Sequence, residues 1–239
     1  MTLTPDTLIL FALGPIPLNA TIVFTWVVML LLTVASWLIT RNLSSGADMS
    51  YSQNLLEVLV NTIRDQIAQI SLQRSDQYLA FIGTLFVFII TANLLAIIPG
   101  YYPPTGSLST TTALAICVFI AVPLFGISNE GLLNYLRHYI RPSLMMLPFN
   151  LIGELSRVIS LSVRLYGNIM SGTVVVGILL SLMPIFFPIV IQLLGLITGV
   201  IQAYIFAILA MVYIASASSS PPDSKSPPNN EPEQKPETR

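Results

Sequence analysis

The chain has 239 residues, 54% of them hydrophobic and only 9% charged, and its formal net charge is −1. Soluble domains carry about 25% charged residues, so this chain cannot cover a water-facing surface, and lipid must be much of its solvent. The small net charge gives no basis for nucleic-acid binding, and the sequence has no GxxxxGK[ST] loop for the phosphates of ATP.

The first 40 residues predict an external segment followed by a membrane-crossing helix. No Lys or Arg precedes the apolar stretch in residues 1–18. We therefore expect this part to remain on the mature protein, with residues 1–19 outside and near the membrane surface. Ala20–Thr40 contains no charge, and at 1.5 Å per residue it is long enough to cross a hydrocarbon core of about 30 Å.

Residues 41–77 have a different character, because charged side chains alternate with apolar ones at helical spacing. This pattern predicts an amphipathic helix on the membrane surface or against a partner. Two further apolar runs follow, Tyr78–Ile98 and Thr112–Ser128, joined by the turn-rich segment PGYYPPTG. The second run contains Pro123, so it either crosses the membrane with a tilt or packs as a hairpin with the first.

Two long apolar stretches close the membrane part of the chain, Phe149–Leu182 and Pro184–Ser216. Each exceeds the roughly 20 residues that a perpendicular helix needs, so we expect both to be strongly tilted, kinked or partly irregular. Prolines at 184 and 188 break the helical pattern between them. Residues 217–239 are polar and rich in proline, which predicts a disordered tail.

These elements predict an all-α membrane protein with about five membrane-crossing helices and one amphipathic surface helix, in which residues 20–216 form one integral membrane domain. Most of the Lys and Arg residues lie in the loops at 41–77 and 129–148 and in the tail. The positive-inside rule then places the N-terminus outside and the C-terminus in the cytoplasm. The single cysteine, Cys117, can form no internal disulfide, and its apolar neighbours predict a buried position.

Three charged residues, Glu154, Arg157 and Arg164, lie within the long apolar stretches. An arginine near the bilayer centre costs at least about 2.5–3.5 kcal/mol on insertion scales, and it cannot escape by losing its proton. The two arginines are two helical turns apart and point the same way. The same stripe carries three polar residues, Ser160, Asn168 and Ser171.

The two arginines differ in the partners that their own helix offers. Glu154 lies one turn before Arg157, so it can serve as the counter-ion of Arg157 at the i, i+3 spacing. Arg164 has no anion within reach on its own helix, and its partner must come from another helix or another chain. A static interhelical ion pair, or a side chain that reaches to the membrane surface, remains the alternative for Arg164.

The last apolar stretch carries a complementary face at spacings of three and four residues, formed by Gln192, Gly195, Gly199, Gln202 and Phe206. Its small residues let another helix approach closely, and plain packing is the simplest explanation for the glycines. A buried glutamine needs hydrogen-bond partners, so Gln202 is a better candidate than the glycines for a polar group with a functional role.

Two segments together resemble subunit a of F-type ATP synthases, most closely the bacterial and chloroplast-like members. They are SLSVRLYGNIMSG at Ser160–Gly172 and VIQAYIFAILAMVYIA at Val200–Ala215. The N-terminal GPIPLNATIVFTW fits the same family, and the resemblance covers roughly residues 10–216. The Arg-Leu-aromatic-Gly-Asn core combined with the downstream Ile-Gln-Ala-x-Ile-Phe makes the match specific.

The resemblance implies a membrane stator beside a rotating ring of c subunits, each of which carries a carboxylate. Ions would enter by one half-channel, bind that carboxylate, be carried around by the rotating ring and leave by a second half-channel. The essential arginine of the family matches Arg164, its asparagine matches Asn168, and its glutamine on the last helix matches Gln202. The resemblance also implies that the two long helices lie steeply tilted along the ring.

Two positions depart from the usual pattern of the family. Many relatives have a titratable residue, commonly Glu, nine residues after the arginine, and here that position is Thr173. Others have Glu or His seven residues before the glutamine, and here that position is Gly195. Glu154 is the only carboxylate of the two long helices. H+ is the transported ion most often found in the family.

Sodium is the alternative coupling ion, because a sodium path needs only oxygen ligands. Hydroxyls and amides that can supply them belong to Ser160, Asn168, Ser171, Thr173 and Gln202. The pattern also resembles the alternate or N-type branch of the family, which is thought to pump sodium. We assign Glu154, Arg157, Ser160, Ser171, Thr173 and Gln192 to the expected ion access path, with no cofactor and no fixed metal site.

The resemblance implies that residues 149–215 contact the c-ring and that b subunits of the peripheral stalk and other ATP synthase subunits are partners. Because the sequence has no GxxxxGK[ST] loop, we expect that this chain does not itself bind or hydrolyse ATP. The resemblance also implies a bacterial plasma membrane, with a cyanobacterial thylakoid as the alternative. Two other classes of function remain open: a stand-alone channel or transporter that uses Arg164 to bind a small anion, and a structural membrane scaffold.

Overall fold

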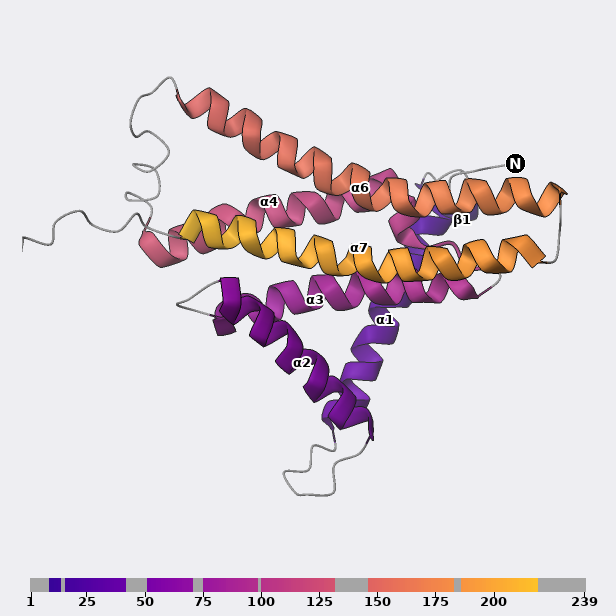
Figure 1. The fold of residues 1–239 in the computed structure, drawn as a ribbon, viewed down its shortest axis with the longest axis horizontal. Helices are drawn as coiled ribbons and strands as arrows, with labels where there is room; N and C mark the ends of the chain where they lie inside the picture. Colours follow the sequence, from indigo (N-terminus) through magenta and orange to yellow (C-terminus); the bar gives the residue numbers. More distant parts are fainter. Residues whose placement is uncertain are drawn as a thin grey trace, which may run out of the picture.

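A computed structural model describes residues 9–13, 16–41, 51–70, 75–98, 100–131, 146–182 and 186–218 of the chain (Figure 1). They form helices α1 (Ala20–Thr40), α2 (Tyr51–Ile70), α3 (Ser75–Leu94), α4 (Leu108–Glu130), α6 (Met146–Leu182) and α7 (Phe186–Ser218). Two short 3-10 helices, η2 (Leu95–Ile97) and η3 (Pro104–Gly106), connect α3 to α4, and an antiparallel hairpin of β1 (Ile9–Leu13) and β2 (Ile16–Asn19) precedes α1.

The predicted class, an all-α membrane protein, is confirmed. Five helices of the described part are long and apolar enough to cross a membrane, namely α1, α3, α4, α6 and α7. Helix α1 has the bounds expected from its apolar run, and α7 ends at Ser218, two residues beyond the expected end of the last apolar stretch at Ser216. The rest of the predicted disordered tail and most of the charged loop at 129–148 lie outside the described residues.

Helices α3, α4, α6 and α7 pack into a bundle, in which α7 contacts each of the other three. Their shared core contains Leu85 and Ile89 of α3, Ala115 and Val118 of α4, Leu161 and Leu165 of α6, and Ala203, Phe206 and Ala210 of α7. Helix α4 continues through Pro123. Helices α3 and α4 meet at one end, where the Phe125 ring packs edge-on against Tyr78 and Phe81.

Helices α1 and α2 lie to one side of this bundle, and α1 runs across its long direction (Figure 1). Helix α2 occupies the middle of the segment that was expected to be amphipathic, and it packs on α3 and α7. Its exposed residues include Glu57, Arg64 and Asp65. Charged residues on one face and apolar contacts on the other are typical of a helix at a membrane surface.

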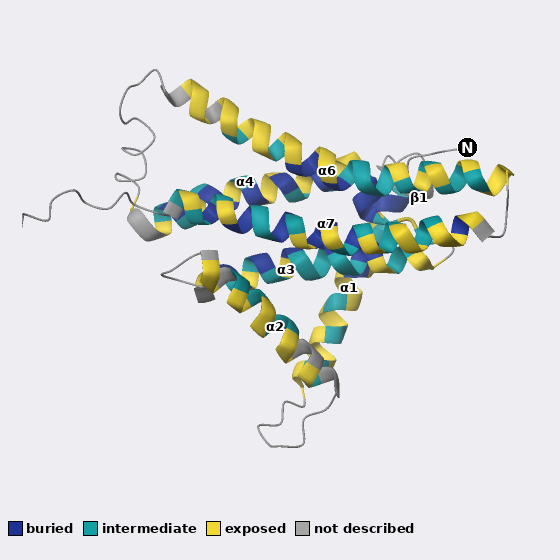
Figure 2. Ribbon diagram, viewed as in Figure 1, coloured by how far each residue is buried: buried dark blue, intermediate teal, exposed yellow. Residues whose placement is uncertain are grey.

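The two C-terminal helices are far longer than a perpendicular crossing requires. Helix α6 has 37 residues and α7 has 33, or about 55 and 50 Å at 1.5 Å per residue. A hydrocarbon core of about 30 Å accommodates such lengths only if the helices tilt or extend beyond it. The N-terminal half of α6 diverges from α4 and α7 and is largely exposed, whereas its middle is buried where it meets the bundle (Figure 2).

The single cysteine corrects one expectation from the sequence. Cys117 lies on α4 with its side chain exposed, although all of its neighbours are apolar. In a membrane-crossing helix the apolar surface extends over the lipid-facing side as well as over the core. Apolar neighbours therefore do not indicate burial there as they do in a soluble protein.

Buried Asn93 of α3 joins three elements of the bundle. Its amide nitrogen donates to the carbonyl oxygen of Gly199 on α7 at 2.9 Å, and its amide oxygen accepts from the Thr105 hydroxyl at 2.7 Å. The approach to α7 depends on glycine, because a Cβ on Gly199 would lie 3.2 Å from Cβ of Asn93. The expected role of Gly199 in close packing is confirmed.

Gly199→Ala should therefore lower the stability of the protein, although alanine favours helices. Asn93 is only 2% exposed and is held by two hydrogen bonds, so it cannot move aside, and overpacking of this kind typically costs about 1–3 kcal/mol. Gly195→Ala is the matched control, since a Cβ there meets nothing within 4 Å and should stabilise α7 by about 0.5–1 kcal/mol. Thermal unfolding midpoints of the purified variants in detergent measure both, and equal shifts would contradict the packing role.

Candidate functional site

Arg164 lies near the middle of α6, on the face of the helix turned away from the core. Its neighbours Leu165, Leu161 and Ser162 are buried in the bundle, whereas Arg164 itself is exposed. The expected stripe exists, because Arg157, Ser160, Arg164 and Ser171 are all exposed, and Asn168 is half-buried. The helix thus has an inner face that packs in the bundle and an outer face that carries permanent positive charge.

No ion pair joins Arg164 to a carboxylate among the residues that the structure describes. Its one hydrogen bond there is long, from Nη2 to the hydroxyl of Ser160 at 3.5 Å. The surrounding exposed side chains are apolar, including Ile159 and Val163. Arg164 therefore carries a charge for which the described part of the chain supplies neither an anion nor a strong set of acceptors.

Arg157 is held differently, by an aromatic ring of the neighbouring helix. Its guanidinium carbon lies 5.0 Å from the centre of the Tyr213 ring of α7, within the range of a cation–π contact. No ion pair links it to Glu154 among the described residues, and Glu154 is half-buried. The charge of Arg157 still acts on the Glu154 carboxylate without a direct ion pair, as the i, i+3 spacing predicted, and the contact with Tyr213 between α6 and α7 is an addition that helical spacing cannot reveal.

Two amide groups of the predicted site are buried without a hydrogen-bond partner for their nitrogen atoms. They are Nδ2 of Asn168 on α6 and Nε2 of Gln202 on α7. A buried donor left without an acceptor costs about 1–3 kcal/mol, so such groups are uncommon in stable proteins. Both of these amides therefore need an acceptor, such as a buried water molecule, or a change of rotamer that exposes the nitrogen atom.

The other polar residues of the predicted site have local partners. The hydroxyls of Ser171 and Thr173 donate to carbonyl oxygens of their own helix, those of Asn168 and Ile169, at 3.1 and 2.9 Å. Gln192 donates from Nε2 to the carbonyl oxygen of Ala96 at 3.0 Å and so ties α7 to η2. Gln192 and Gln202 share one face of α7, but only the first has an acceptor for its amide nitrogen.

The structure adds polar contacts to which the sequence analysis gave no role. The hydroxyl of Ser162 on α6 lies 2.8 Å from that of Thr112 and 3.3 Å from that of Thr111, both on α4. In the loop between α3 and α4, burial raises the pKa of the Tyr101 phenol well above its usual range, so the hydroxyl stays protonated at neutral pH. Asn93, a single amide in an otherwise apolar run, is the one residue whose type could have indicated its contacts from the sequence.

The arrangement is suited to the electrostatic stabilisation of an anion that binds transiently, and not to acid–base chemistry. Arginine stays protonated and cannot act as a general acid or base at neutral pH. It can favour the ionised form of a carboxylate placed beside it, because an opposite charge within about 4–6 Å lowers the pKa of such a group. The two unpartnered amide nitrogens, on α6 and α7, can donate to the same kind of acceptor once a change of rotamer exposes them.

Comparison with known proteins gives one consistent result along almost the whole chain. A family model described as ATP synthase A chain matches residues 22–215. ATP synthase subunit a 2 of Acaryochloris marina is 62% identical over 91% of this chain and 93% of its own. ATP synthase subunit a of Albidiferax ferrireducens is 57% identical (91% and 94%), and ATP synthase subunit a 1 of Chlorobaculum parvum is 56% identical (91% and 96%).

Proposed function

The chain belongs to the ATP synthase A chain family, and from this premise we propose that it is the subunit a that carries ions past the rotor of an F-type ATP synthase. As a member of that family it is an integral membrane protein of an ATP synthase complex, with a part in ion transport and ATP synthesis. In the proposed mechanism, a ring of c subunits turns against α6 and α7 (residues 149–215) and presents one carboxylate after another to Arg164.

Arg164 acts in this mechanism as an electrostatic gate. When a ring carboxylate arrives, the guanidinium favours its ionised form and so releases the bound ion. Two unit charges 4 Å apart attract by about 4 kcal/mol at an effective dielectric near 20, which is enough to displace an ion and small enough for a rotating ring to break. The fixed charge also repels cations and prevents a direct leak between the entry and exit half-channels.

The single observation that carries this proposal is the state of Arg164 within the described residues: exposed, central on α6 and without a carboxylate partner. A static ion pair, as a scaffold would use, needs an anion that this part of the chain does not supply. The amides of Asn168 and Gln202, whose buried nitrogen atoms lack a partner in this part of the chain, can donate to a carboxylate from another chain once a change of rotamer brings them to the surface.

We propose H+ as the transported ion, moving through water and the polar residues Glu154, Ser160, Ser171 and Thr173. Arg157 and Gln192, which the sequence analysis also assigned to the path, are left out of it because their polar groups are engaged by Tyr213 and Ala96. A proton path does not need a titratable side chain at Thr173 or Gly195, where many relatives have one. Sodium is the second candidate, because the hydroxyl and amide oxygens of the site are hard ligands of the kind that such cations take. The binding site on the ring, a different polypeptide, sets the choice between them.

The remaining parts of the proposal concern position and partners. Loop charges favour an N-terminus outside and a C-terminus in the cytoplasm of a bacterial plasma membrane, or the corresponding orientation in a thylakoid. The b subunits of the peripheral stalk would hold the chain still against the turning ring. ATP would be made or hydrolysed on other subunits, since this sequence has no loop for its phosphates.

Purification through an affinity tag on this chain tests the proposal. We expect the tagged chain to bring down c subunits and an ATPase head. In vesicles, the complex should then acidify the lumen when ATP is added, without a requirement for sodium. A protonophore should abolish the signal.

Two other outcomes would decide against parts of the proposal. Sodium-dependent ATPase activity, with sodium-22 uptake that a protonophore does not prevent, would establish sodium as the coupling ion. A tagged chain that purifies alone or as a homo-oligomer, and that carries a small anion across vesicles, would replace the stator function by that of a stand-alone transporter.

A further inference from the structure

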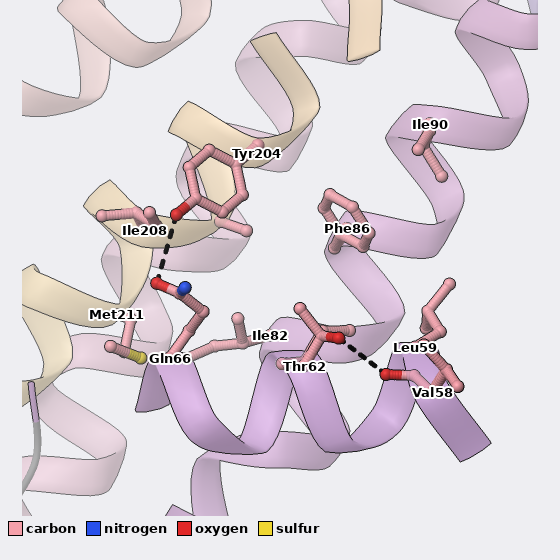
Figure 3. A pocket seen from close by; sticks show the side chains of 12 residues that line it. Val58, Leu59, Thr62, Gln66, Ile82, Phe86, Ile90, Tyr204, Ile208 and Met211 are labelled. Carbon is pink, nitrogen blue, oxygen red and sulfur yellow. Dashed lines mark hydrogen bonds between the residues drawn. The ribbon is translucent and has the colours of Figure 1, made fainter. Parts of the chain in front are cut away.

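A pocket of about 340 Å³ opens between α2, α3 and α7 (Figure 3), and Arg164 is not among its lining residues. Helix α2 contributes one wall through residues such as Val58 and Thr62, α3 contributes Phe86 and Ile90, and α7 contributes Ile208 and Met211. The volume lies at the lower end of the range for small-molecule sites in proteins, about 300–1,000 Å³. It is more than twice that of a cavity of about 150 Å³ that binds benzene.

The walls of this pocket offer almost nothing to a polar occupant. Nine of its twelve lining residues are aliphatic, phenylalanine or methionine. The two hydroxyls among the others are already donating: Thr62 to the carbonyl oxygen of Val58 at 2.7 Å, and Tyr204 to Oε1 of Gln66 at 3.1 Å. Water needs two to four polar partners to stay in a cavity, and apolar cavities remain dry or take apolar guests.

The position of the pocket indicates where an apolar occupant comes from. Two of its walls belong to helices long and apolar enough to cross a membrane, α3 and α7, and the third belongs to the amphipathic helix α2. Val58 and Tyr204, 59% and 42% exposed, border the pocket. The pocket is therefore open to the acyl chains that surround a membrane protein, at the level where an interfacial helix lies.

We propose that this pocket is a lipid site that holds one acyl chain of a membrane phospholipid between α2 and the bundle. The narrow apolar space suits a linear hydrocarbon chain, and the charged outer face of α2 keeps the headgroup at the membrane surface. The bound chain braces the part of α7 that follows Gln202. This inference goes beyond the proposed function, because it depends only on the membrane-crossing helices and the amphipathic character of α2.

A photoreactive lipid tests the site in the assembled membrane complex. The complex is loaded with phosphatidylglycerol that carries a diazirine in the middle of one acyl chain, then diluted into unlabelled lipid and illuminated. Mass spectrometry maps the adducts. We expect adducts on the pocket segments of α2 and α7 to persist after dilution, at least fivefold above those on Leu30, an exposed residue of the membrane-crossing helix α1.

Filling the pocket gives the specific control. Val58→Trp places a large ring at its rim and should reduce the pocket adducts at least fivefold, whereas Val34→Trp, the same change at an exposed site on α1, should leave them unchanged. Ile208→Trp fills the pocket from α7 if the α2 variant fails to assemble. Three outcomes would each overturn the proposal. The pocket adducts could be no more abundant than those on Leu30, they could be unchanged in both filling variants, or the pocket could crosslink to another subunit.

Discussion

Arg164→Ala should abolish ATP-driven ion transport while the complex still assembles. The charge contributes about 4 kcal/mol at 4 Å to the release of an ion from a ring carboxylate, which corresponds to roughly a thousandfold in rate. Its removal should not destabilise the chain, because Arg164 has only one long hydrogen bond among the described residues. The measurement is lumenal acidification by the reconstituted complex, beside the ATPase activity of the same sample. Lysine should not rescue transport fully, since it can lose its proton.

Arg157→Ala is the matched control for this change, on the same exposed stripe and two turns away. Its guanidinium packs on Tyr213, so its loss should cost about 0.5–1 kcal/mol of stability and leave transport within a few fold of the wild type. Vigorous pumping by the Arg164 variant would exclude the gating role. Equal loss of transport in both variants would show that the whole stripe, and not one residue, forms the gate.

Hydrophobicity alone was enough to predict the membrane-crossing helices, because lipid leaves few ways to satisfy the backbone. The run at Ala20–Thr40 became α1 with the same bounds, and α6 and α7 are separate helices as expected. The expected break at Pro188 was wrong, because α7 begins at Phe186 and a proline is tolerated in the first turn of a helix. The packing order was less predictable. For Thr112–Ser128 the sequence left open a tilted crossing helix or a hairpin with the run before it. In the structure this segment belongs to α4, which packs mainly on α6 and α7. Its partners could not be predicted, because α7 comes much later in the chain and contacts both α3 and α4.

The candidate site divides in the same way, between features along one helix and features between helices. Spacing predicted the stripe of Arg164 and its lack of an anion on the same helix. It also predicted the buried face of Gly199, Gln202 and Phe206. It did not predict that Tyr213 covers Arg157 or that Ala96 takes the amide of Gln192, because those contacts depend on how α7 is placed against its neighbours.

Gln202→Leu should separate stability from transport. The side chain is 8% exposed and its Nε2 has no acceptor, so an apolar replacement of similar size should leave the chain as stable as before or more so, by up to about 1–3 kcal/mol. Transport should fall roughly 10–100-fold, because a hydrogen bond to a charged group contributes about 1.5–3 kcal/mol. The thermal unfolding midpoint and ATP-driven acidification measure the two effects on one preparation.

Gln192→Leu on the same face of α7 should give the opposite pair of results. Its amide nitrogen already donates to Ala96, so leucine removes a bond between α7 and η2 and lowers stability by about 1 kcal/mol. Transport should stay within about twofold of the wild type once the amount of assembled complex is matched. The hydrogen bond that is removed joins two parts of this chain and contributes nothing to the interaction with the moving carboxylate. If the two variants behave alike, the unpartnered amide of Gln202 has no special part in moving ions, and packing explains its burial.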